Sequence, residues 1–130
     1  MTPVIVVAAV IERDDAFLLT LRQAGTHLAD HWEFPGGKVH ISESHNEALR
    51  RELFEELDIV ATVGEAVHTV THAYPEKTVE LYFYRCEFEG EPKPMMGQAM
   101  RWVPRAGLRE LPFPEADSDL ILLLDRATGP

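Results

Sequence analysis

Three glutamates between residues 52 and 56 have the types and spacing that can hold a divalent cation. Glu52 precedes Glu55 by three residues and Glu56 by four, so on a helix the three carboxylates lie on one face. Crowded carboxylates repel one another unless a cation neutralises them, and Mg²⁺ or Mn²⁺ prefers such oxygen ligands together with substrate phosphates. We therefore interpret this face as a candidate metal site. The alternative is a solvated helix face, on which Arg51 pairs with Glu55 four residues later.

The helix that must position these carboxylates is predicted from Ser44 to Leu57. Ser44 and Glu47 have the S-x-x-E spacing of a capping box. Leucines recur every four residues up to Leu57, on a face that suits packing against a sheet. Asp58 follows the helix, where we expect the left-handed backbone of a C-terminal cap, at a cost of about 1 kcal/mol relative to glycine.

The segments that flank this helix resemble the Nudix box, G-x5-E-x7-R-E-U-x-E-E-x-G-U, in which U is a bulky apolar residue. The matching positions are Gly37, Glu43 and the run from Arg51 to Ile59, and only the family's second glycine differs, being Asp58 here. Upstream, the sequence PGG at 35–37 predicts a tight turn with free backbone carbonyls beside the helix.

The resemblance implies a fold, a reaction and a cofactor. The fold is an α/β/α sandwich around a central mixed β-sheet with two principal helices, whereas pattern alone gives only the class α/β (α+β). The reaction is phosphoanhydride hydrolysis assisted by Mg²⁺, with Mn²⁺ as an alternative. The implied metal ligands are Glu52, Glu55, Glu56 and the Gly37 carbonyl, and Arg51 with Glu43 would form an ion pair that orients them. Glu43 can equally be a first-turn acid favoured by the helix dipole.

Outside the box, the segments VVAAVIERDD, LRQAG, WEFPGGK and LPFPEAD resemble the MutT-like branch of the family, the 8-oxo-dGTP and CTP pyrophosphohydrolases. This resemblance covers most of the chain and implies that the products are a nucleoside monophosphate and pyrophosphate. It places Arg22 and Lys38 near the substrate phosphates. His27 would lie in a loop over the site, either as a ligand contact or as a solvated histidine.

Asp117 bears on base recognition, because in MutT-like enzymes the residue after F-P-x-A touches the base edge. An ionised aspartate only accepts hydrogen bonds, which favours an exocyclic amine such as cytosine N4 or adenine N6. A protonated Asp117 can also donate, which leaves oxidised purines open. The alternative is that Asp117 caps the last helix, predicted from 117 to 127. Tyr74 and Phe83 are either stacking partners for the base or core residues.

Met96 stands where this branch often carries a glutamate that is proposed as a metal ligand or base. A thioether neither takes a proton nor binds Mg²⁺ well. Two alternatives to a triphosphate pyrophosphohydrolase therefore stay open: a hydrolase of another nucleoside diphosphate linked to X, and a Nudix-type module that binds a nucleotide with little catalysis.

Length, net charge and cysteine content restrict the classes of protein to which this chain can belong. The 130 residues predict one domain, residues 1–130, with five or six strands and two principal helices. The net charge of −10 argues against a nucleic-acid polymer or an anionic membrane as partner. It does not argue against a small nucleotide, whose phosphates can be bridged by bound metal. The single cysteine, Cys86, predicts a buried thiol and a reducing compartment, so we expect a cytoplasmic protein. The oligomeric state is open between a monomer and a homodimer, which an exposed strand edge could support. We find no signal peptide and no membrane-spanning run.

Overall fold

The computed structural model describes residues 2–26 and 28–126 and contains two α-helices, two short 3₁₀ helices and eight strands within them. The helices are α1 (His45–Leu57), η1 (Arg105–Glu110), η2 (Glu115–Asp117) and α2 (Ser118–Arg126). The strands are β1 (Val4–Val10), β2 (Glu12–Arg13), β3 (Ala16–Leu21), β4 (Trp32–Glu33), β5 (Gly36–Lys38), β6 (Val60–Ala73), β7 (Thr78–Glu89) and β8 (Met100–Pro104). Among the described residues, no helix is both long enough and apolar enough to span a membrane.

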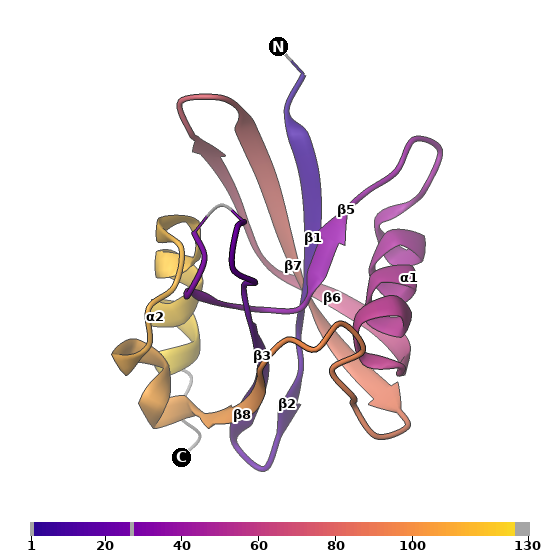
Figure 1. Ribbon diagram of the computed structural model, residues 1–130, viewed down its shortest axis with the longest axis vertical. Coiled ribbons are helices and arrows are strands. Elements are labelled where there is room, and N and C mark those ends of the chain that lie inside the picture. The colour runs from indigo at the N-terminus through magenta and orange to yellow at the C-terminus, as the bar shows by residue number, and fades with distance from the viewer. Residues whose placement is uncertain (1, 27, 127–130) are drawn as a thin grey trace.

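A mixed sheet with strand order β5-β1-β7-β6 forms the centre of the molecule. β1 runs parallel to β7 and antiparallel to β5, and β6 pairs antiparallel with β7. A smaller antiparallel sheet contains β2, β3, β4 and β8. Figure 1 shows α1 on one side of the strands and α2 on the other. The predicted α/β/α sandwich with a central mixed sheet is therefore confirmed.

β1 lies between two hydrophobic cores, which is typical of a strand with a continuous apolar run. Val7 and Ala9 pack into the core under α1, whereas Ala8 and Val10 pack into the core under α2. All four are at most 5% exposed. Because β1 is fixed on both faces, the strand that pairs with its edge, β5, is held at a set distance from α1.

α1 begins and ends as the sequence predicted. Ser44 is its N-cap, and the capping box is present, with the Glu47 amide 3.0 Å from the Ser44 Oγ. The leucines of its inner face are fully buried. Asp58 closes the helix in the left-handed conformation (φ 57°, ψ 37°), and its amide donates to the Phe54 carbonyl at 3.0 Å.

Several boundaries differ from the sequence predictions. Residues 36–38 form the edge strand β5 rather than a free turn, because they continue the ladder of β1. The last α-helix starts at Ser118, since Glu115–Asp117 forms a 3₁₀ turn before it. β6 runs through Gly64, and its pairing with β7 shifts register between Val63 and His68.

Candidate active site

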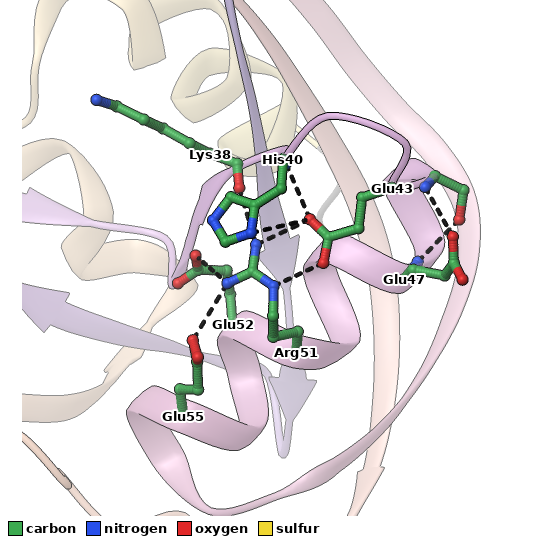
Figure 2. Close-up of polar contacts among 8 residues, drawn as sticks. Lys38, His40, Glu43, Glu47, Arg51, Glu52 and Glu55 are labelled. Atoms are coloured by element: carbon green, nitrogen blue, oxygen red, sulfur yellow. Dashed lines mark hydrogen bonds and ion pairs between the residues drawn. The ribbon is translucent and has the colours of Figure 1, made fainter.

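Arg51 is the centre of the polar cluster on the outer side of α1 (Figure 2). Its Nε and Nη2 donate to the two carboxylate oxygens of Glu43 at 2.6 and 2.9 Å, so the predicted ion pair is present and bidentate. Its Nη1 donates to Glu52 at 2.8 Å and to Glu55 at 3.1 Å, and Nη2 also reaches the Lys38 carbonyl at 3.0 Å. Hydrogen bonds from Arg51 lower the pKa of Glu43 to about 2. Arg51 thus joins the start of the box to two of its helix glutamates.

Glu52 lies directly against the backbone of β5. A Cβ atom added to Gly37 would stand 2.6 Å from both carboxylate oxygens of Glu52, closer than real atoms approach. A side chain at residue 37 would force the flexible Glu52 carboxylate to move from this position. The spacing of the box therefore brings Gly37 and the first helix glutamate into direct contact.

The strand register decides which backbone carbonyls of β5 face the helix. Val39 and Pro35 are hydrogen-bonded to Ile5 and Ala9 of β1, and Gly37 pairs with Val7 midway between them. In an antiparallel ladder this alternation assigns Gly37 to a hydrogen-bonded pair, with its carbonyl directed to β1. The carbonyls of Gly36 and Lys38 point to the open edge. Gly36 is therefore better placed than Gly37 to offer a carbonyl ligand.

Glu56 is the buried carboxylate of the three. It accepts a hydrogen bond from the Gly36 amide, while its Oε2 is buried without a partner. Burial, followed by the charges of Glu52 and Glu33, raises the pKa of Glu56 to about 8. A bound cation would give this oxygen a partner and would reduce the repulsion between the neighbouring carboxylates.

The donor set fits a divalent cation that takes oxygen ligands. Glu52, Glu55 and Glu56 lie at one end of α1 beside an open backbone edge, and Mg²⁺ characteristically completes such a set with water and phosphate. Within the described residues, no three acidic, histidine or cysteine side chains converge closely enough to enclose a metal by themselves.

A cavity of about 280 Å³ opens beside these groups and extends to the N-terminal end of α2. Gly36, Gly37 and Lys38 line one part of it, and Asp117 with the aromatic residues Phe34, Tyr74 and Phe83 lines another. Lys38 points away from the Arg51 cluster (Figure 2), and its strand partner Val6 also lines the cavity. The cavity therefore connects a cationic, backbone-lined part to an aromatic part with one buried acid.

Asp117 is only 4% exposed at this cavity. Burial and the charge of Glu33 raise the pKa of Asp117 to about 7, against the opposing effect of Arg22. The sequence left both the ionised and the protonated form of Asp117 open, and a pKa of about 7 keeps both forms relevant near neutral pH. Asp117 belongs to the 3₁₀ turn η2 before α2.

A smaller cavity of about 120 Å³ lies on the other side of Glu33. Its lining includes Arg22, Glu33, Glu56, Met96 and Gln98. Arg22 donates to Glu33 at 2.9 Å, so this predicted phosphate contact is already engaged with a carboxylate. Met96 therefore does lie beside a helix glutamate, as its position in the sequence suggested.

The remaining predicted residues have different surroundings. Phe83 is 1% exposed and packs edge-to-face on Phe34 at 5.8 Å between ring centroids, so much of its surface serves the core. Tyr74 is half-buried, and burial followed by the charge of Asp117 raises the pKa of its hydroxyl. Cys86 is buried as predicted, which raises the pKa of its thiol to about 12. His27 lies outside the described residues.

Sequence reasoning missed Glu33, which borders both cavities. Burial raises the pKa of Glu33, and its charge acts on both Glu56 and Asp117. No local pattern could reveal this, because Glu56 and Asp117 are far from it in the chain. Lys77 was also missed, although its period-two spacing from Val79 and Leu81 was a usable signal for the same sheet face.

Comparison with known proteins identifies the family. A family model described as a NUDIX domain matches residues 6–123. The chain is 42% identical over 120 residues to the CTP pyrophosphohydrolase of Escherichia coli K12, covering 91% of this chain and 87% of that one. It is 32% identical over 123 residues to the 8-oxo-dGTP diphosphatase of the same strain, covering 94% and 95%. The chain therefore belongs to the Nudix family.

Solved structures agree with this assignment. The solution structure of the E. coli ORF135 protein superposes with a TM-score of 0.86 at 38% identity, covering 100% of this chain and 95% of that one. The MutT Nudix hydrolase of Burkholderia pseudomallei gives a TM-score of 0.81 at 28% identity, covering 98% and 100%. Within the family, the chain is a Nudix hydrolase of the MutT-like type, a group whose reactions generally use divalent metal ions.

Proposed function

We propose that this chain is a Mg²⁺-dependent nucleoside triphosphate pyrophosphohydrolase that releases a nucleoside monophosphate and pyrophosphate. The proposed substrates are (d)CTP-like nucleotides or oxidised nucleotides such as 8-oxo-dGTP. Relatives of nearly full coverage carry both names, a CTP pyrophosphohydrolase at 42% identity and an 8-oxo-dGTP diphosphatase from Haemophilus influenzae at 40%. We further expect a cytoplasmic monomer or homodimer.

The observation that carries this proposal is the continuity of the larger cavity. Its lining includes Gly37 and Lys38 of β5, the strand that packs against the carboxylate helix, and also Asp117 and several aromatic residues. A nucleotide needs this combination, because its phosphates require cations and its base requires an apolar slot with a few polar groups. The volume of about 280 Å³ is close to the lower end of small-molecule sites.

In this proposal the helix glutamates hold the cation. Glu52, Glu55 and Glu56 would bind it together with the outward carbonyl of Gly36. When bound, a divalent cation neutralises phosphate charge and lowers the pKa of an attached water. Arg51 fixes the rotamers of Glu52 and Glu55, and Glu43 fixes Arg51, so the carboxylates are held before substrate arrives.

Asp117 is proposed to read the base edge. A protonated Asp117 both donates and accepts, which matches cytosine N3 and N4, whereas the ionised form matches only the amine. Because the pKa of Asp117 is about 7, cytosine binding should strengthen as the pH falls through that value. Asparagine offers the same donor and acceptor at every pH.

The first experiment measures pyrophosphate release from CTP, dCTP, 5-methyl-dCTP, dGTP, 8-oxo-dGTP and ATP, with and without Mg²⁺, between pH 6 and 8.5. We expect metal-dependent release, with KM for cytosine nucleotides rising above pH 7 in the wild type and staying flat in Asp117→Asn. Asp119→Asn, an exposed acid two residues later, is the matched control. A pH-independent preference for 8-oxo-dGTP that survives in Asp117→Asn contradicts the proposed reading by Asp117.

Met96 favours one alternative, a Nudix module that binds nucleotides with little turnover, because it puts a thioether where an acid could serve. Glu55→Gln distinguishes the two. It should abolish turnover in an enzyme while leaving nucleotide binding within about threefold. Binding without pyrophosphate release in the wild type supports the module.

A further inference from the structure

Met96, in the loop between β7 and β8, lines the smaller cavity together with Glu56 and Glu33. Apart from Leu21, the other lining residues have polar side chains. Met96 is 50% exposed, so its side chain is accessible to small solutes. The thioether itself is a poor ligand for hard cations and a weak hydrogen-bond acceptor.

The backbone around Met96 is fixed from two sides. Its amide donates to the Gln98 side chain at 2.9 Å, and its carbonyl accepts from the Gln23 side chain at 2.9 Å. Gln98 in turn donates to the Glu56 carbonyl at 3.3 Å, which also accepts from the Met95 amide at 3.0 Å. The loop is therefore tied to the same turn of α1 that carries the buried carboxylate, so a chemical change on Met96 acts beside Glu56.

Methionine sulfur is oxidised in proportion to its exposure, and the sulfoxide is a polar group with a hard oxygen. Met95 is exposed to a similar extent, 55%, but does not line the smaller cavity. Cys86 is 4% exposed, and the raised pKa of its thiol protects it further. A cavity of about 120 Å³ leaves room for the added oxygen, since one water takes about 30 Å³ of liquid volume.

We propose that Met96 is an oxidation site, and that its sulfoxide supplies a hard oxygen donor which strengthens divalent-cation binding beside Glu56. The inference rests on the proposed function, which puts a cation at that carboxylate. The oxidant is a peroxide: a sulfur lone pair forms the S–O bond as the peroxide O–O bond breaks. Sulfur loses two electrons, and the remaining hydroxide takes a proton and leaves as water. Thiol-dependent reduction of the sulfoxide reverses the change.

The test measures Mn²⁺ binding without nucleotide, from the signal of free Mn²⁺ in electron paramagnetic resonance, before and after dilute hydrogen peroxide. Peptide mass spectrometry records which methionines gain oxygen. Met96→Leu removes the oxidisable sulfur at nearly constant shape, Met95→Leu is the matched control, and Met96→Gln supplies a permanent oxygen donor. We expect oxidised wild type and Met95→Leu to bind Mn²⁺ about tenfold more tightly, the size of a supporting-ligand effect.

Met96→Leu should then show no response to peroxide, and Met96→Gln should bind Mn²⁺ more tightly than Met96→Leu without any oxidant. Unmodified Met96 beside oxidised Met95, unchanged or weaker Mn²⁺ binding by the Met96 sulfoxide, or an equal response in Met96→Leu would each overturn the proposal. If Mg²⁺-dependent nucleotide hydrolysis occurs but oxidation leaves Mn²⁺ affinity unchanged, only this inference fails. If Mn²⁺ binding tightens but no nucleotide is hydrolysed, the proposed function fails instead.

Discussion

Two arginines organise two different regions of this molecule by similar chemistry. Arg51 binds Glu43, Glu52 and Glu55, and its side chain keeps 25% exposure at the edge of the candidate active site. Arg105 binds Glu12 and Asp15 at 2.8 Å each and the Leu124 carbonyl at 2.6 Å, with only 7% exposure. Arg51 connects residues of one sequence motif, whereas Arg105 connects the β2–β3 turn to the end of α2.

The difference lies in what each arginine leaves unpaired. Around Arg105 the charges and the helix carbonyl are satisfied, so the cluster can serve stability. Around Arg51 the neighbouring Glu56 stays outside the network, with an orphaned oxygen and a raised pKa. Incomplete pairing in a buried site is unfavourable for the empty protein and useful for binding a cation.

The largest effect is expected at Arg105. Arg105→Met leaves the Leu124 carbonyl and Glu12 without their partner and should lower the free energy of unfolding by about 3 kcal/mol, at the lower end for buried pairs because Asp15 is exposed. Urea denaturation gives the value. Arg109→Met, which removes a 62% exposed arginine on the same 3₁₀ helix, should change it little. Equal losses in both variants would contradict the assigned scaffold role.

Arg51 should affect turnover more than stability. Arg51→Ala frees the rotamers of Glu52 and Glu55, so kcat should fall about 10- to 100-fold while the chain stays folded. Arg51→Lys keeps the charge but loses the bidentate geometry, and should recover little of that loss. Steady-state pyrophosphate release provides the measurement, with the exposed neighbour variant Arg50→Ala as control. Full activity in Arg51→Lys would show that charge alone suffices.

Glu56 tests the unpaired carboxylate directly, in the absence of divalent cations. Its pKa is about 8 in the folded chain against an ordinary 4.5, so wild-type stability should decline as the pH rises from about 4.5 to 8. Asp117 and Glu33 also have raised pKa values, so Glu56→Gln removes only the Glu56 part of that decline, and it should be more stable than wild type at pH 8 by on the order of 2 kcal/mol. Thermal unfolding at several pH values measures this, and Glu55→Gln, at an exposed position, is the control. Adding Mg²⁺ should stabilise only the wild type.

The smallest effect is expected at Asp58, where the helix that carries the Arg51 cluster ends. Asp58→Gly relieves the left-handed backbone and should add up to about 1 kcal/mol of stability with unchanged kcat. Its ion pair with Lys93, 4.0 Å between exposed groups, contributes little. Asp58→Ala should instead destabilise the chain, since alanine has neither glycine's freedom nor aspartate's tolerance. A change in kcat in Asp58→Gly would mean that the cap also positions Glu55 or Glu56.

Features that depend on short-range geometry could be predicted from the amino-acid sequence. The span of α1, its capping box, the left-handed Asp58 and the common face of Glu52, Glu55 and Glu56 all follow from local backbone rules. The motif spacing also sufficed to identify the family, because all but one of the fixed positions of the Nudix box are matched.

Features that depend on proximity between distant segments could be seen only in the folded chain. Residues 36–38 form a strand because they pair with β1. In that register the carbonyl of Gly36 points away from β1, whereas the carbonyl of Gly37 points towards it. Glu33 borders both cavities because β4, which carries it, pairs with β3 in the smaller sheet. The pKa of Asp117 moved to about 7 because burial and a distant glutamate act through space. Local sequence fixes which groups a segment presents, while desolvation and charge are properties of the neighbours that folding brings to them.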